Sequence, residues 1–225
     1  MGNLLRLIAF DLDGTLVNSR RDLSDSANEL IVELHGAPLT EEAIGLMIGE
    51  GAATLVRRAL AAAGLGNPPG ALERFREIYD TRLLNHTRPY DGIPEAVRAA
   101  RQYGRVVVLT NKPARPSERI LEGLGLRDLF EEVIGGDGLW PRKPDPASLI
   151  GLMARNGTIA EQTLLIGDSA IDHETALRAG VRCCLATYGF GYATFEPNRL
   201  TGHEWFAPHA SAIPDVLEEF VKVGA

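Results

Sequence analysis

The stretch FDLDGT, residues 10–15, directly follows an apolar run at residues 4–10, and this junction decides the fold. A short run rich in Leu, Ile and Phe that ends at polar residues is typical of a strand buried on both faces of a parallel sheet. Asp11 and Asp13 stand at the carboxyl end of that strand, which is the edge of such a sheet where ligands bind. The sequence therefore predicts a first strand with a polar site at its end.

Similar apolar runs recur along the chain and alternate with helical patterns. They lie at residues 106–109, 164–166 and 181–185, with a weaker one at residues 133–134. Helical patterns occupy residues 94–102, 116–124, 147–155 and 173–179. This alternation predicts an α/β fold with a doubly wound parallel sheet, a Rossmann-like core with helices on both faces.

The interval from residue 17 to residue 88 breaks the alternation. It has no strand pattern but four helical stretches, at residues 22–34, 41–48, 52–63 and 71–84, separated by Gly and Pro. We expect a Rossmann-like catalytic core formed by residues 1–16 and 89–225, and an all-helical cap, residues 17–88, inserted after the first strand. Because the insertion starts at a strand end, the cap would lie over the site as a lid.

Composition excludes several classes of protein. The net charge of −7 over 225 residues lacks the excess of Lys and Arg that nucleic-acid binding requires. No apolar run approaches the roughly 18 residues of a membrane span. The two cysteines are adjacent, which does not suit a disulfide framework. We expect a cytoplasmic protein, a monomer or homodimer, with no nucleic-acid or membrane partner.

Two groups of carboxylates follow predicted strands. Asp11 and Asp13 end the first strand, and Asp168 and Asp172 follow the run at residues 164–166. Helix capping would explain Asp168 alone, but carboxylates at two strand ends converge on one crevice and repel each other unless a cation neutralises them. An all-oxygen cluster favours Mg²⁺, and the chain has neither the Cys pairs nor the His-Glu-x-x-His helix typical of zinc.

Side chains of opposite polarity follow two other strands. Thr110 and Asn111 come after the run at residues 106–109, and Lys143 lies beyond the weaker run at residues 133–134. Lysine is scarce here, since only Lys112, Lys143 and Lys222 occur, which weakens the interpretation of Lys143 as an ordinary surface lysine. A hydroxyl, an amide and an ammonium beside Mg²⁺ predict a site for a phosphoryl group.

These residues resemble the four motifs of the haloacid dehalogenase superfamily, in order and over nearly the whole chain: Asp11 to Thr15, Thr110-Asn111, Lys143, and Gly167-Asp168-Ser169 through Asp172. Within it the chain resembles the phosphoglycolate phosphatase group, through residues 48–51 and 55–60, residues 109–113, and residues 135–137 with 142–146. Asn18 departs from the family, which commonly has Asp there, and this position lies at the expected cap hinge.

The resemblance implies covalent catalysis. Asp11 would attack phosphorus and form an aspartyl phosphate, and Asp13 would protonate the leaving oxygen and then activate water. Mg²⁺ would be bound by Asp11, Asp168 and the backbone carbonyl of Asp13, with Asp172 as an outer or variable ligand. Thr110, Asn111 and Lys143 would hold the phosphoryl group.

The expected function is hydrolysis of a small phosphate monoester, with 2-phosphoglycolate the leading candidate. Arg57 and Arg58 of the cap are the candidate ligands of its carboxylate, against the alternative that both lie on a solvated helix face. Two other functions stay open. A sugar phosphate mutase would use the same Asp11 and Asp13 but return the phosphate to substrate, and a non-catalytic relative would only bind a phosphorylated ligand.

Overall fold

The computed structural model describes residues 6–223, and its core is a parallel sheet. Among these residues six strands follow the order β5-β4-β1-β6-β7-β8. Strand β1 (Leu7–Phe10) lies at the centre, between β4 (Arg105–Leu109) and β6 (Thr163–Gly167). The outer strands are β5 (Glu132–Ile134), β7 (Arg182–Ala186) and β8 (Trp205–Ala207). Phe10 pairs with Val108 and with Ile166, so the three central strands end level with one another.

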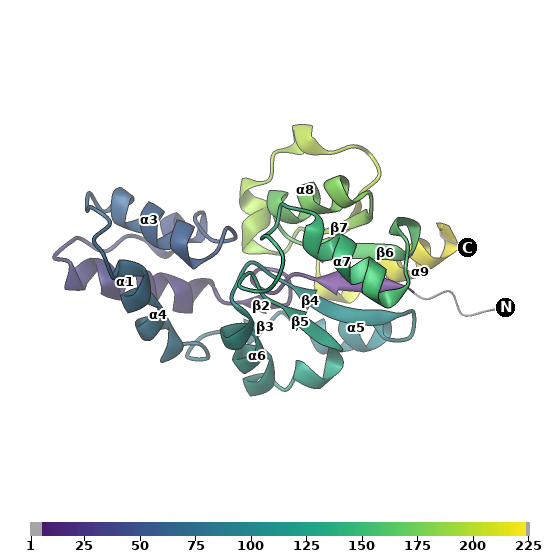
Figure 1. The fold of residues 1–225 in the computed structure, drawn as a ribbon, viewed down its shortest axis with the longest axis horizontal. Helices are drawn as coiled ribbons and strands as arrows, with labels where there is room; N and C mark the ends of the chain where they lie inside the picture. Colours follow the sequence, from purple (N-terminus) through teal and green to yellow (C-terminus); the bar gives the residue numbers. More distant parts are fainter. Residues whose placement is uncertain (1–5, 224–225) are drawn as a thin grey trace.

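Helices cover both faces of the sheet (Figure 1). Leu7 and Ala9 of β1 face a core shared with α7 (Ala147–Asn156) and α8 (Ala170–Ala179). Ile8 and Phe10 face the opposite core, shared with α5 (Ile93–Ala100), α6 (Ala114–Gly123) and α9 (Ile213–Val223). Neighbouring residues of a strand point to opposite faces, so a strand buried on both sides is apolar throughout. The predicted doubly wound α/β fold is confirmed.

The structure adds elements that the sequence pattern did not predict. These are the edge strand β8, the helix α9 and short 3₁₀ turns at Arg127–Leu129, Ala160–Gln162, Phe190–Thr194, Pro197–Arg199 and Ala210–Ala212. Residues 4 and 5 of the predicted first strand lie outside the described part of the chain. The other predicted core strands and helices are present, with ends shifted by up to three residues.

Four helices between β1 and α5 form a helical insertion beside the core: α1 (Arg20–Glu33), α2 (Glu41–Gly45), α3 (Ala52–Ala62) and α4 (Ala71–Asp80). The chain enters and leaves it through two short antiparallel strands, β2 (Val17–Asn18) and β3 (Arg88–Pro89). No strand was predicted there, because two-residue strands are too short for an apolar pattern. Figure 1 shows the insertion projecting to one side of the sheet.

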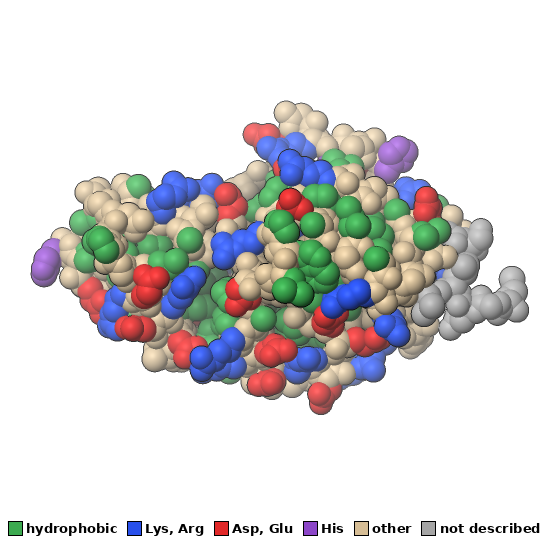
Figure 2. All heavy atoms as spheres, in the orientation of Figure 1, with side chains coloured by type: hydrophobic (Ala, Val, Ile, Leu, Met, Phe, Trp, Pro, Cys, Tyr) green, Lys and Arg blue, Asp and Glu red, His purple; other side chains and the backbone are tan. Residues whose placement is uncertain are grey.

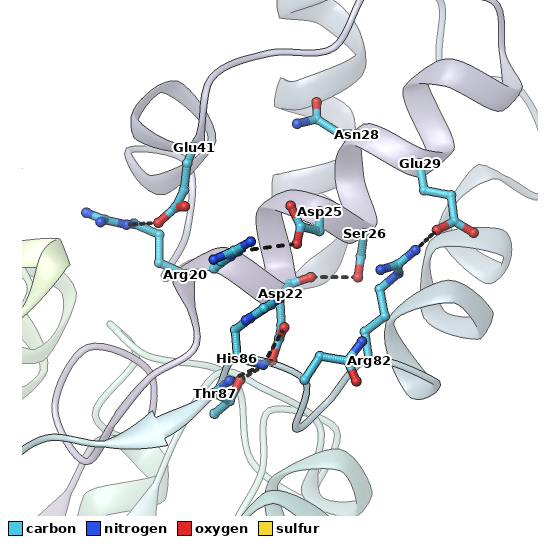
Figure 3. A network of polar contacts seen from close by, with 12 residues as sticks. Arg20, Asp22, Asp25, Ser26, Asn28, Glu29, Glu41, Arg82, His86 and Thr87 are labelled. Atoms are coloured by element: carbon cyan, nitrogen blue, oxygen red, sulfur yellow. Dashed lines mark hydrogen bonds and ion pairs between the residues drawn. The ribbon is translucent and has the colours of Figure 1, made fainter.

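The buried carboxylate of Asp22 forms hydrogen bonds between the two ends of the insertion (Figure 3). Asp22, on the first turn of α1, is 1% exposed. Its carboxylate accepts the backbone N–H groups of His86 and Thr87, at 3.0 and 2.8 Å, and the Thr87 hydroxyl at 2.7 Å. A buried carboxylate is stable only when its oxygens are satisfied in this way. Asp22 therefore joins the start of the insertion to its end.

The surface carries intermingled charges. Figure 2 shows acidic and basic side chains interspersed over the visible face. Within residues 6–223, no helix combines the length and the apolar character that crossing a bilayer requires. Cys183 and Cys184 are buried free thiols on β7. The cytoplasmic location and the monomer or homodimer state stay predictions.

Candidate active site

The carboxyl ends of the three central strands bring the motif residues together. Asp11 follows β1, Thr110 follows β4 and Asp168 follows β6. Oxygen atoms of Asp11, Asp168 and Asp172 lie within 4.8 Å of one another, and all three residues are buried. The level strand ends explain why residues so far apart in sequence converge here.

Lys143 contacts two of these three carboxylates. It comes from the loop between β5 and α7 and is 5% exposed. Its Nζ lies 2.9 Å from Asp11 Oδ1 and 2.6 Å from Asp172 Oδ1. Burial alone would lower the pKa of the ammonium, but the two carboxylates raise it above its usual value. Lys143 therefore stays charged beside the carboxylates.

One ammonium does not balance the three carboxylates. Burial raises the pKa of Asp11 to about 7, and Asp172 and Asp13 add to this against the opposing effect of Lys143. Burial, followed by Asp172 and Asp11, also raises the pKa of Asp168 well above its usual value. Asp11 Oδ1 has no hydrogen bond, because its approach to Lys143 is an ion pair without hydrogen-bond geometry. These oxygens fit a hard divalent cation, which would supply the missing positive charge.

Asp172 is already engaged by protein groups through both of its oxygens. It occupies the first turn of α8, where it forms a capping box with Ser169. Asp172 Oδ2 accepts the Ser169 hydroxyl at 2.6 Å, and Oδ1 accepts Lys143. Of the three carboxylates, this one is best suited to orient Lys143 and least free to bind a metal ion directly.

Asp168 is enclosed by backbone. Its Oδ2 accepts the Gly191 N–H at 2.7 Å. Gly14, with φ of +88°, passes so close that a Cβ there would overlap the Asp168 carboxylate. The glycine after Asp13 is therefore required both by the turn and by this close approach.

Asp13 points to a different set of partners. Ser19, just before α1, donates to Asp13 Oδ1 at 2.5 Å. Lys112 Nζ donates to Oδ1 at 3.0 Å and to Oδ2 at 2.9 Å, and is 4.6 Å from the centre of the Tyr79 ring on α4. The side chain of Asp13 thus lies between the core and the helical insertion, and the cluster of Asp11, Asp168 and Asp172 does not include it.

Asn111 connects the core to the insertion rather than pointing only toward a phosphoryl site. Its Nδ2 donates to the Lys143 carbonyl at 2.9 Å and to the Gly49 carbonyl of the insertion at 3.0 Å. Its Oδ1 is buried without a hydrogen-bond partner. Thr110 Oγ1 accepts the Lys112 N–H at 3.2 Å, which leaves the hydroxyl proton free to donate to a ligand.

A cavity of about 560 Å³ lies between the core and the helical insertion. Asp11, Asp13 and Thr110 line its reactive end. Apolar side chains from both parts of the chain line much of the rest, among them Leu23, Ile48, Leu55, Phe75 and Pro116. The cavity has the size of a small-molecule site, and the strand-end residues Asp11 and Thr110 line it.

The structure does not bring the predicted Arg57 and Arg58 to this cavity. Arg57 is exposed, and Arg58 pairs with Glu50 at 2.5 Å. Helix α3 buries Leu55, Val56, Ala59 and Leu60, so the two arginines fall on its opposite face. The arginines that line the cavity are Arg76, Arg115 and Arg142.

Two of the residues at the site were not selected from the sequence as site residues. The sequence marks Lys112 only through the scarcity of lysine and its place in the family segment at residues 109–113. Its position directly after Thr110 and Asn111 was the signal that could have identified it. Arg142 precedes Lys143 and begins the family segment at residues 142–146, and nothing else in the sequence marks it.

Comparison with known proteins agrees with this geometry. A family model described as haloacid dehalogenase-like hydrolase matches residues 8–186. The phosphoglycolate phosphatase of Rhodospirillum rubrum is 43% identical over 194 residues, 82% of this chain and 80% of that protein. That of Cereibacter sphaeroides is 38% identical over 221 residues, 95% of this chain and 98% of that protein. The crystal structure of a predicted phosphoglycolate phosphatase from Haemophilus somnus has a TM-score of 0.86 and 31% identity, covering 94% of this chain and 97% of that one.

The chain belongs to the haloacid dehalogenase-like hydrolase family. It is an enzyme of the phosphoric monoester hydrolase class, and the family members that it resembles at 38 to 43% identity are phosphoglycolate phosphatases.

Proposed function

We propose that this protein is a Mg²⁺-dependent phosphatase that hydrolyses a small phosphate monoester through an aspartyl phosphate on Asp11. The observation that carries the proposal is the cluster of three buried carboxylates, Asp11, Asp168 and Asp172, in which Lys143 contacts two and Asp11 also lines the cavity. Uncatalysed hydrolysis of phosphate monoesters is extremely slow, and covalent catalysis divides it into two easier steps.

Asp11 and Asp168, with the backbone carbonyl of Asp13, would hold the metal ion. The ion supplies positive charge for the phosphoryl oxygens and keeps Asp11 ionised. Asp172 would act from outside, by fixing the ammonium of Lys143 beside Asp11. Lys143 and the Thr110 hydroxyl would donate to the phosphoryl oxygens, whose charge shifts during transfer.

Asp11 and Asp13 divide the covalent chemistry. An Asp11 carboxylate oxygen forms the new bond to phosphorus as the bond to the ester oxygen breaks, and Asp13 gives its proton to that leaving oxygen. In the second step Asp13 takes a proton from water, the water oxygen attacks phosphorus, and Asp11 is released with inorganic phosphate. Asp13 is suited to both roles because it lies in the cavity between the phosphoryl site and the helical insertion.

The leading substrate candidate is 2-phosphoglycolate. It is supported by the names of the relatives with 43% and 38% identity over most of the chain. The helical insertion would act as the cap, closing over the leaving group so that its residues and the facing core loops select the substrate.

Phosphate release from a panel of phosphorylated compounds tests the proposal. The panel contains 2-phosphoglycolate, glucose 1-phosphate, 5′-nucleotides and pyrophosphate at one Mg²⁺ concentration. We expect 2-phosphoglycolate to give the highest kcat/KM. A tenfold advantage for another compound, about 1.4 kcal/mol of transition-state preference, would reject this substrate. Return of the phosphate to substrate instead of water would identify a mutase.

The variant Asp11→Asn tests the covalent mechanism. The amide has the same shape as the carboxylate but is neither a nucleophile nor an anionic ligand, so we expect loss of turnover with the fold retained, the latter checked by circular dichroism. Appreciable residual activity in a preparation free of wild-type enzyme would reject the aspartyl phosphate.

A further inference from the structure

Beyond the phosphoryl site, the acidic residues that line the cavity have partners, whereas two of the arginines lack a carboxylate partner in the part of the chain that the structure describes. Its acidic residues are engaged elsewhere: Glu77 pairs with Arg74 at 2.9 Å, Asp80 pairs with Arg119, and Asp137 accepts the Ala114 N–H at 2.8 Å. Arg115 and Arg142 also line the cavity, and within residues 6–223 neither has a carboxylate within ion-pair distance. Among the described residues, the lining groups here without an ion-pair partner are thus two guanidinium groups and one carboxylate, Asp137, so the balance beyond the phosphoryl site is positive.

Arg142 is held more rigidly than Arg115. Its Nε donates to the Gly136 carbonyl at 2.8 Å, and its side chain is half-buried, whereas Arg115 is exposed. The Gly136 N–H in turn donates to the Lys112 carbonyl at 2.9 Å. The guanidinium is thus fastened to the loop that follows β4, and its two terminal nitrogens form the edge that stays available for a ligand.

The helical insertion approaches this same edge. Gly51, at the start of α3, has φ of +88°, and a Cβ there would lie 2.9 Å from Arg142 Nη1. Gly51 therefore lets the insertion pass over the guanidinium without a side chain in the way. The guanidinium is half-buried beside the insertion, and partial burial strengthens a charge-assisted hydrogen bond formed at that position.

We propose that Arg142 binds a second anionic group of the substrate, a carboxylate on the leaving-group side of the phosphate ester. This inference rests on the proposed function and assigns its substrate selection to the core loop that carries Lys143. The planar edge of a guanidinium, with two parallel N–H groups, matches the two oxygens of a carboxylate. Arg142 lines the same cavity as Asp11 and Thr110, so one small substrate can reach both the phosphoryl site and the guanidinium.

Two esters that differ only in the group at issue test the assignment. In 2-hydroxyethyl phosphate, a neutral CH₂OH replaces the carboxylate of 2-phosphoglycolate. In the wild type, 2-phosphoglycolate should have the higher kcat/KM. In Arg142→Gln the ratio of the two kcat/KM values should fall about tenfold or more, since hydrogen bonds to charged groups contribute that much. Arg142→Lys, which keeps the charge but not the planar edge, should lie between. Arg98→Gln, an exposed arginine on α5, is the matched control and should leave the ratio unchanged.

Three outcomes would overturn the assignment. The first is an equal fall of kcat/KM for both esters in Arg142→Gln, and the second is a wild-type enzyme with the same kcat/KM for both. The third is a selective fall of kcat/KM for 2-phosphoglycolate in Arg115→Gln but not in Arg142→Gln. The second and third leave a phosphatase intact and reject only the role of Arg142. Thermal melting of each variant shows whether an equal loss reflects unfolding.

A binding measurement separates this inference from the proposed function. Calorimetry with Asp11→Asn protein and Mg²⁺ measures the affinity for both esters without turnover. Adding Arg142→Gln to the Asp11→Asn protein should weaken the binding of 2-phosphoglycolate about tenfold more than the binding of 2-hydroxyethyl phosphate. If the wild type hydrolyses neither ester, the proposed substrate fails, but this difference still supports an anion site at Arg142. Absence of the difference rejects that site whatever the enzyme hydrolyses.

Discussion

The Lys112 ammonium contacts both carboxylate oxygens of Asp13, at 3.0 and 2.9 Å, although 98 residues separate the two in the sequence. Lys112 is 7% exposed, and Tyr79 of the helical insertion covers it. The contact fixes where the proposed acid and base of the reaction lies. It also links that group to a residue of the proposed cap.

The leaving group should reveal this role. Asp13→Asn should lower kcat/KM, which reports the step in which the leaving group departs, by about 10² to 10⁴ for an alkyl ester such as 2-phosphoglycolate, because the leaving oxygen needs a proton. The loss should be much smaller for p-nitrophenyl phosphate, whose leaving group departs without one. Lys112→Gln should show the same dependence on leaving group with a smaller loss, since it displaces Asp13 without removing it. Equal losses with both esters would contradict this role for Lys112.

Removal of Mg²⁺ should abolish activity. Asp11, Asp168 and Asp172 form a buried all-oxygen cluster, which has no use for a soft metal. We expect EDTA to stop phosphate release and Mg²⁺ to restore it. Mg²⁺ should also raise the melting temperature of the wild type, because ligand binding to the native state stabilises it, and should raise that of Asp168→Asn much less. Full activity in exhaustively chelated buffer would refute the metal requirement.

Glu204 should make stability depend on pH. Burial raises the pKa of its carboxyl, but hydrogen bonds from His173 and Thr201 outweigh this and lower it from 4.5 to about 2. Its contribution is therefore complete above pH 4.5 and is lost as pH falls toward 2. Glu204→Gln should be less stable than the wild type at pH 5, and the difference should shrink by pH 3.

Unfolding by guanidinium chloride at pH 5, 4 and 3 measures the difference in free energy of unfolding between wild type and Glu204→Gln. Histidine in the unfolded chain is already protonated over that range, so its titration in the unfolded state does not add to the change. Glu196→Gln is the control, because Glu196 has a side chain 65% exposed. A stability difference between wild type and Glu204→Gln that stays constant with pH would show that Glu204 acts only through packing.

Loss of Asp22 should destabilise the protein strongly. Asp22→Ala leaves the N–H group and the hydroxyl of buried Thr87, and the N–H of His86, without their acceptor, so we expect a loss of about 2 to 4 kcal/mol in the free energy of unfolding. Asp25→Asn, on the same helix with a side chain 43% exposed and a loose 3.8 Å pair to Arg21, should change it by less than about 0.5 kcal/mol. Similar values for the two variants would contradict the role of Asp22.

The sequence predicted the strands whose side chains are buried on both faces. Such strands are apolar without interruption, as β4 and β6 are after their first residues. Strand β8 lies at the sheet edge, where Phe206 is 43% exposed, so it has no such run. Helix α9 differs, because the spacing of Ile213, Val216, Leu217 and Phe220 is that of an amphipathic helix and is visible in the sequence.

In the candidate site, too, the sequence predicts some features and leaves others undetermined. Residues directly after strands could be placed together from the sequence, because parallel strands end at one edge of the sheet. Pairs such as Lys112 with Asp13 depend on where long side chains turn, which no spacing reveals. The face of α3 that carries Arg57 and Arg58 follows from the apolar positions Leu55, Val56, Ala59 and Leu60, which already indicate that the arginines point away from the core.

The burial of Lys112 and Lys143 has a practical consequence for chemical labelling. The chain has three lysines, and only Lys222, in the last turn of α9, is exposed among them. Reagents that acylate amines need an accessible, neutral side chain, and the two buried lysines are shielded and paired with carboxylates. A dye or surface coupled to lysine at Lys222 would therefore be attached to α9, on a helix that contributes no residue to the cavity.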